Sequence, residues 1–196
     1  MHIQISDHFN YNKLLRFALP SIIMMIFSSL YSVVDGFFVS NIAGKTSFAA
    51  VNLIVPVIMI LASNGFMFGA GGSALISKTM GEGDHDKAQR LFSLFVYFIA
   101  ISGIVISVVG YIFIRPIAVL LGADGVLLED CVCYGRILLC SMPFYMLQFG
   151  FQSFFVTAGK PNLGLAVTLI CGITNMILDA LFMAVFSWGI AGAALA

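Results

Sequence analysis

Two aspartates interrupt long stretches of the chain that otherwise carry no charged side chain. Asp35 follows the uncharged stretch 17–34, and Asp179 separates the uncharged stretches 161–178 and 180–196. Asn175 precedes Asp179 by four residues, so the two side chains would project from one face of a helix. Carboxylate and amide oxygens are suitable ligands for a small hard cation. Alternatively, two neighbouring carboxyl groups withdrawn from water could carry a proton and titrate as a coupled pair.

The composition places these aspartates in a membrane protein. Hydrophobic residues make up 61% of the 196 residues and charged residues only 9%, whereas soluble domains average about 45–50% and about 25%. Nine basic and nine acidic side chains give no net charge, so the chain lacks the basic surface that a nucleic-acid partner requires. This balance argues against a soluble enzyme, a disordered chain and a disulfide scaffold. It predicts an all-α integral membrane protein, and we expect no enzymatic activity.

The spacing of the charges predicts the membrane-spanning helices. A helix needs about 20 mostly apolar residues to cross a bilayer, and the uncharged stretches are long enough for five crossings. We predict helices over 17–40, 50–77, 91–114, 131–158 and 163–187, with a sixth starting near residue 190. An acid at membrane depth costs several kcal/mol unless it is paired, protonated or exposed to water. Asp35 and Asp179 are therefore candidates for a functional site.

The basic residues predict the orientation of these helices, because cytoplasmic loops carry an excess of lysine and arginine. A cytoplasmic N-terminus would place six of the nine basic residues inside: Lys13, Arg16, Lys78, Lys87, Arg90 and Lys160. At about 1.5 Å per residue, Asp35 and Asp179 would then lie about 27 and 24 Å from the cytoplasmic ends of their helices. Tyr134 would lie at a comparable level. We expect one carboxylate pair, one amide and one phenol to meet in a single outward pocket.

Three further features belong to the predicted helices. Gln148 and Gln152 are four residues apart and share a face, which they could turn either to a polar cavity or to a neighbouring helix. Pro20 removes a backbone hydrogen bond and is a candidate hinge, although a fixed kink would also account for it. The small residues 69–73 lack the Lys-Ser/Thr ending of a phosphate-binding loop, so we interpret them as a helix-packing surface.

Several motifs resemble those of multidrug and toxic compound extrusion (MATE) transporters. The first are Leu19-Pro20 and Val34-Asp35-Gly36-Phe37-Phe38-Val39, followed by Gly71-Gly72-Ser73-Ala74 and Gly81-Glu82-Gly83-Asp84 with Ala88. The later ones are Ala158-Gly159-Lys160-Pro161-Asn162, Asn175-Met176-Ile177-Leu178-Asp179 and Gly189-Ile190-Ala191-Gly192-Ala193-Ala194. Each motif is weak alone. In this order and spacing, from about residue 14 to the last residue, the set is specific.

The resemblance implies a twelve-helix transporter of two six-helix lobes in a bacterial or archaeal plasma membrane. Such a transporter exports small organic cations in exchange for sodium ions or protons by alternating access. Residues 1–196 would form the N-terminal lobe, inactive alone, with the missing C-terminal lobe expected as the rest of the same chain. No cofactor is expected apart from Na⁺ or H⁺ as the coupling ion.

The resemblance also implies roles for individual residues. In the family's DinF-like and related prokaryotic branches, the positions of Asp35, Asn175 and Asp179 form the sodium or proton coupling site. Asp35, Tyr134 and Asp179 match the positions of a substrate or proton relay. Pro20 matches a proline that is associated with bending of the first helix.

Two other functions stay open at this point. The first is a lipid or polysaccharide flippase of the same superfamily, which would be expected to use a more basic cavity. The nine basic residues fall mostly in the predicted loops, which argues against it. The second is a small non-transporting membrane protein that is complete at 196 residues. Carboxylates serve both ions, so the residues do not distinguish sodium from proton coupling.

Overall fold

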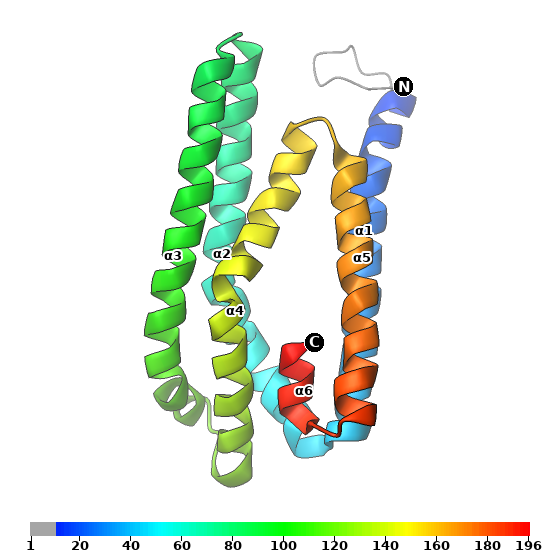
Figure 1. The fold of residues 1–196 in the computed structure, drawn as a ribbon, viewed down its shortest axis with the longest axis vertical. Coiled ribbons are helices and arrows are strands. Elements are labelled where there is room, and N and C mark those ends of the chain that lie inside the picture. The colour runs from blue at the N-terminus through cyan, green and yellow to red at the C-terminus, as the bar shows by residue number, and fades with distance from the viewer. Residues whose placement is uncertain (1–10) are drawn as a thin grey trace.

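The computed structural model describes residues 11–196, which form an all-helical bundle (Figure 1). The predicted all-α fold, with five long helical segments and a short sixth, is confirmed for this part of the chain. The segments are α1 (Tyr11–Phe38) with the π-helical turn η1 (Val39–Ala43), α2 (Lys45–Gly81), α3 (His85–Leu120), α4 (Gly125–Thr157), α5 (Pro161–Asp179) with the π-helical turn η2 (Ala180–Val185), and α6 (Gly189–Leu195).

The helices extend beyond the predicted apolar stretches. Helix α2 has 37 residues and α3 has 36, or about 55 Å each at about 1.5 Å per residue. The hydrocarbon core is only about 30 Å thick. Helix α2 continues past Lys78, and α3 continues through Arg115 and Pro116. A charged side chain marks the edge of the hydrocarbon, but it does not interrupt the backbone hydrogen bonds that carry a helix into the headgroup region.

Four segments are long and apolar enough to cross a membrane: Ala18–Ala43, Lys45–Gly81, His85–Leu120 and Pro161–Val185. The fifth predicted crossing, α4, is less apolar than these. Polar side chains recur along the second half of α4 at Ser141, Tyr145, Gln148 and Gln152. Helix α4 nevertheless runs between α3 and α5 in Figure 1 and packs closely on α2 and α3.

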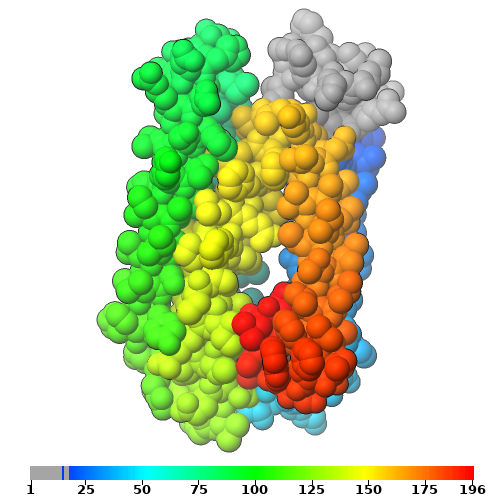
Figure 2. Space-filling model, in the orientation of Figure 1, coloured from blue at the N-terminus to red at the C-terminus, as the bar shows by residue number. Residues whose placement is uncertain are grey.

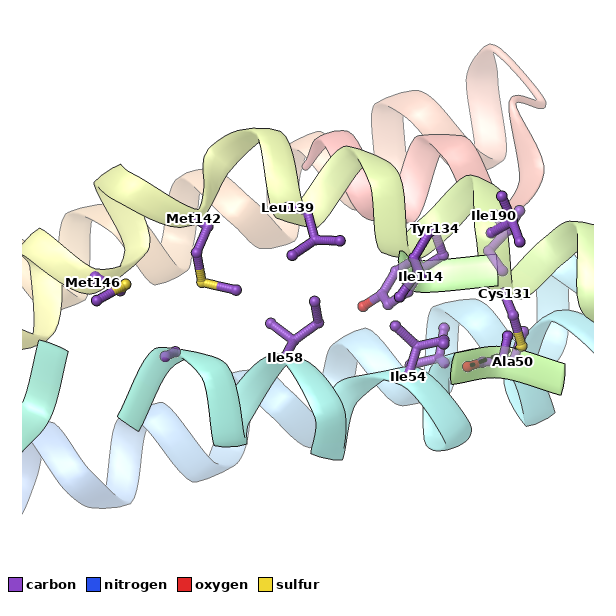
Figure 3. Close-up of a cluster of buried hydrophobic side chains, with 14 of the residues drawn as sticks. Ala50, Ile54, Ile58, Ile114, Cys131, Tyr134, Leu139, Met142, Met146 and Ile190 are labelled. Atoms are coloured by element: carbon purple, nitrogen blue, oxygen red, sulfur yellow. Dashed lines mark hydrogen bonds between the residues drawn. The ribbon is translucent and has the colours of Figure 1, made fainter. Parts of the chain in front are cut away.

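The helices form two groups. Helices α2, α3 and α4 contact one another extensively, and α1 pairs with α5. Helices α1, α3 and α5 run in one direction, while α2 and α4 run in the other (Figure 1). The short α6 turns back between the groups and contacts α4. The core lies within the first group, where Ile54, Ile99, Ile114, Leu139, Met142 and Met146 are almost fully buried (Figure 3).

Glycines allow α2 and α4 to approach closely. A Cβ atom on Gly69 would lie 2.7 Å from the Cα atom of Gly150. Gly69 and Gly72 are buried, whereas Ala70 and Gly71 are exposed. Within the predicted packing surface over 69–73, only the face with Gly69 and Gly72 therefore packs on other helices. Gly69 faces α4 and Gly72 faces α3.

Helix α3 begins with a capped turn, and this cap gives a first prediction. One carboxylate oxygen of Asp84 accepts a hydrogen bond from the Lys87 backbone N–H at 3.0 Å. Replacing Asp84 by alanine leaves that N–H without its partner, which costs about 1 kcal/mol. For a chain of this size we expect thermal unfolding in detergent to occur about 2–4 °C lower. The variant Glu82→Ala removes an exposed acid next to the cap and should unfold within about 2 °C of the unchanged protein; equal shifts in both variants would contradict the cap.

Candidate functional site

A cavity of about 460 Å³ separates the two helix groups. Figure 2 shows the molecule hollowed between α4 and α5, with α6 at the base of the opening. Five of the predicted site residues line this cavity: Asp35, Tyr134, Gln148, Gln152 and Asn175. Helices that are far apart in sequence therefore bring one acid, one phenol and three amides to one space.

Each long helix at the cavity contributes a stripe of residues at helical spacing. On α1 the stripe is Ser28, Tyr31, Ser32 and Asp35. On α4 it is Tyr134, Leu138, Ser141, Tyr145, Gln148 and Gln152. On α5 it is Thr168, Cys171, Gly172 and Asn175. The α1 and α5 stripes follow the spacing i, i+3, i+4, i+7, and the α4 stripe recurs every three or four residues, so each stripe is one face of a helix. These stripes explain how mostly apolar helices enclose a partly polar space.

Asp179 differs in position from the other predicted residues. It ends α5, its side chain is 0% exposed, and it is not among the residues that line the cavity. The predicted outward pocket was to hold all four groups; the structure places Asp35, Tyr134 and Asn175 at one cavity, and Asp179 is not among its lining residues. Asp179 lies one helical turn beyond Asn175, and its side chain is fully buried.

Three oxygen atoms in this region are buried without a hydrogen-bond partner in the described part of the chain. They are Oδ1 of Asn175 and both carboxylate oxygens of Asp179. A buried polar group without a partner is costly, and a buried unpaired carboxylate is more so. The two residues thus form a local set of oxygen ligands that a small cation, or a proton on the carboxylate, would satisfy. Such ligands are of the type that hard cations prefer.

Asp35 completes the electrostatics of the site. Its half-buried carboxylate lies within Coulombic range of Asp179 and of the Tyr134 hydroxyl. Tyr134 is 6% exposed and lies beside Ile54 and Ile114 (Figure 3). A positive charge that binds at either carboxylate would therefore relieve repulsion at the other. Among residues 11–196, no group of three or more His, Cys, Asp and Glu side chains is placed to hold a metal ion.

Both acid-bearing helices change to π-helical geometry next to their acid. The turn η1 begins four residues after Asp35, and η2 begins directly after Asp179. The two turns also contact each other. Short π-helical segments are frequent at functional sites, because the extra residue per turn shifts side chains out of the regular register. The contact joins the ends of the two acid-bearing helical segments.

Asp35 also borders a second space. A cavity of about 530 Å³ lies between α1 with η1 and the first half of α2, and its lining includes Asp35, Ser40 and Asn52. The Asp35 carboxylate therefore stands at the wall between this space and the central cavity. Asp35 is conspicuous in the sequence, but nothing there indicates this second space, because Ser40 and Asn52 are ordinary polar residues.

The predicted hinge residue, Pro20, lies inside α1 and is buried. The helix is continuous on both sides of it. Tyr31 and Tyr145 were not predicted, and they add two aromatic side chains to the cavity. Their spacing could have identified them, because Tyr31 precedes Asp35 by four residues and Tyr145 precedes Gln148 by three, which puts each tyrosine on the same helix face as a predicted residue.

Comparisons with known proteins agree with this architecture. A family model described as MatE matches residues 20–181. The multidrug export protein MepA of Staphylococcus saprophyticus is 28% identical over 185 residues, which make up 94% of this chain and 41% of the relative. Crystal structures of MATE in the straight and bent conformations match with TM-scores of 0.85 and 0.84, at 26% and 27% identity. Each match covers 92% of this chain and 40% of the solved one. The chain thus spans about two fifths of the length of these relatives.

Proposed function

This chain belongs to the MATE family of multidrug efflux transporters, and from that premise we propose that it forms the N-terminal lobe of an exporter that exchanges organic cations for Na⁺ or H⁺. The observation that carries the proposal is the group of buried oxygens at Asn175 and Asp179 that have no hydrogen-bond partner among the described residues. Their burial is costly until a cation or proton arrives. Asp35 supplies a second negative charge nearby, on the cavity side.

Coupling follows from competition for this negative charge. An organic cation in the central cavity is attracted by Asp35, and a coupling ion is attracted by Asp179 and Asn175. Binding of one positive charge weakens the attraction for the other, because the two carboxylates lie within Coulombic range. The inward movement of a coupling ion therefore promotes release of the drug. Tyr134 stands near both acids and serves, in this proposal, as part of a proton relay.

The lining of the cavity suits organic cations as substrates. Its volume of about 460 Å³ falls within the usual range of about 300–1,000 Å³ for small-molecule sites. Tyr31, Tyr134 and Tyr145 offer aromatic faces, which attract cations. No lysine or arginine lines the cavity among the described residues. This supports cationic drugs over the anionic, lipid-linked substrates of a flippase.

The proposed transport cycle needs a membrane orientation and a moving element. We place the protein in the plasma membrane with a cytoplasmic N-terminus, as the distribution of lysine and arginine favours. Helix α1 carries both Pro20 and Asp35, so bending at Pro20 would move the acid relative to α5. The relatives solved in straight and bent conformations support such a movement.

The proposal is tested with the complete transporter in proteoliposomes that contain a fluorescent organic cation. A sodium gradient and a proton gradient are imposed separately, each with the membrane potential clamped. We expect one of the two gradients to accelerate export of the dye, and this result also identifies the coupling ion. Export at the same rate without either gradient would contradict the proposal.

A further inference from the structure

A further cavity lies at the end of the bundle away from the aspartates. It has a volume of about 380 Å³ and lies between the C-terminal end of α2, the N-terminal end of α3 and the C-terminal end of α4. In Figure 1 these ends lie at the top of the view, where α4 leans away from α3 towards α5. Lys160, in the connection from α4 to α5, completes the rim.

The sequence indicates the depth of this cavity in the membrane. Three uncharged stretches end beside it: 46–77 ends before Lys78, 91–114 begins after Arg90, and 137–159 ends before Lys160. Apolar lining residues, such as Phe92 and Phe154, lie inside these stretches. Gln89 and Lys160 lie outside them. The cavity therefore straddles the boundary between the hydrocarbon core and the headgroup region.

The inner wall of the cavity is apolar. Phe92 and Phe154 pack edge to face with their ring centroids 5.2 Å apart, and Ile76 and Ala88 complete the wall. Such a surface is well covered by a hydrocarbon chain and poorly covered by water or an inorganic ion. The cavity volume is also within the range of small-molecule sites.

The outer rim of the cavity carries a positive charge. Lys160 is exposed, and it forms no ion pair with the residues that the structure describes. No carboxylate lines the cavity in this part of the chain. Glu82, which follows α2, pairs with Lys78 at 3.9 Å. A cation above an apolar wall is complementary to an anionic amphiphile.

We propose that this cavity binds one anionic phospholipid from the adjacent leaflet, with its phosphate beside Lys160 and part of an acyl chain against Phe92 and Phe154. The lipid would connect the α4–α5 segment to α2 and α3. This contact lies outside the central cavity, so it does not depend on which ion drives transport.

The test measures lipid retention by native mass spectrometry of the purified protein with phosphatidylglycerol or phosphatidylcholine. We expect one phosphatidylglycerol to be retained in preference to phosphatidylcholine. The variant Lys160→Gln should weaken its retention by about fivefold, the effect of one cation near an anionic headgroup. The control Lys87→Gln removes an exposed lysine at the same end of α3, outside the cavity lining, and should retain the lipid as before.

A second variant tests the acyl-chain part of the site. Gln89 is exposed and lines the cavity, so Gln89→Trp should fill the space and displace the lipid without changing the charge. Thermal unfolding is measured for each variant to show that the fold is retained. Equal retention of the two lipids, unchanged retention in Gln89→Trp, or equal losses in Lys160→Gln and Lys87→Gln would overturn the proposal. The proposal would also be overturned if inorganic phosphate raised the unfolding temperature of the protein as much as phosphatidylglycerol does.

Discussion

We expect the Asp179→Asn variant of the complete transporter to lose cation-coupled export while still folding. The amide has nearly the same shape as the carboxyl group, but it carries no charge and releases no proton. Removing one partner of a buried charge pair costs about 2–5 kcal/mol, so binding of the coupling ion should weaken by about thirtyfold or more. The measurement is dye export from proteoliposomes under the driving gradient. The same argument predicts loss of coupled export in Asp35→Asn.

The Asp179→Asn variant should lose transport but should not lose stability. Asp179 is fully buried, and its two carboxylate oxygens have no partner among the described residues. A neutral amide at this position costs less to bury, so the unfolding temperature should be equal or higher. The matched control is Glu129→Gln, which neutralises an exposed acid at the start of α4 that pairs with Arg115 at 2.8 Å. Full export by both Asp179→Asn and Asp35→Asn would contradict the site.

The second large effect concerns stability alone. In Gly69→Ala the new methyl group would lie 2.7 Å from the Cα atom of Gly150. The atom it meets belongs to a backbone, so the helices α2 and α4 must separate. Overpacking of this kind costs about 1–3 kcal/mol, occasionally more. We expect a fall in unfolding temperature of about 2–12 °C, at about 2–4 °C per kcal/mol.

Gly71 provides the control, because it lies in the same helix and a methyl group added there would meet no atom outside that helix within 4 Å. Alanine is a better helix former than glycine by about 0.8–1.0 kcal/mol. Gly71→Ala should therefore be neutral or slightly stabilising. If Gly69→Ala behaved in the same way as Gly71→Ala, the close approach of α2 and α4 would not exist in the folded protein.

Part of the site could be predicted because membrane burial makes polar residues conspicuous. An acid within an apolar stretch is expensive, and this fact alone identified Asp35 and Asp179. The helical periodicity then placed Asn175 on the face of Asp179 and would have extended the prediction to Tyr31 and Tyr145. The all-helical fold followed from the same apolar stretches.

Other features depend on contacts that no local pattern encodes. Nothing in the residues around Asp179 indicates that its side chain is fully buried and outside the cavity lining, because burial depends on tertiary contacts. The π-helical turns have no composition of their own. Helices α2 and α3 extend beyond their uncharged stretches because the charge of Lys78 or Arg115 marks the edge of the hydrocarbon and not the end of a helix.

The polar stripe of α4 has a consequence for how the protein enters the membrane during synthesis. A segment with Ser141, Gln148 and Gln152 gains less free energy on entering lipid than its neighbours do, because each polar group must leave water. Helices α2 and α3, which α4 contacts most closely, are synthesised before it. Their surfaces can receive α4 as it emerges from the translocation machinery. The order of the helices along the chain therefore allows this less apolar helix to insert next to partners that are already in the membrane.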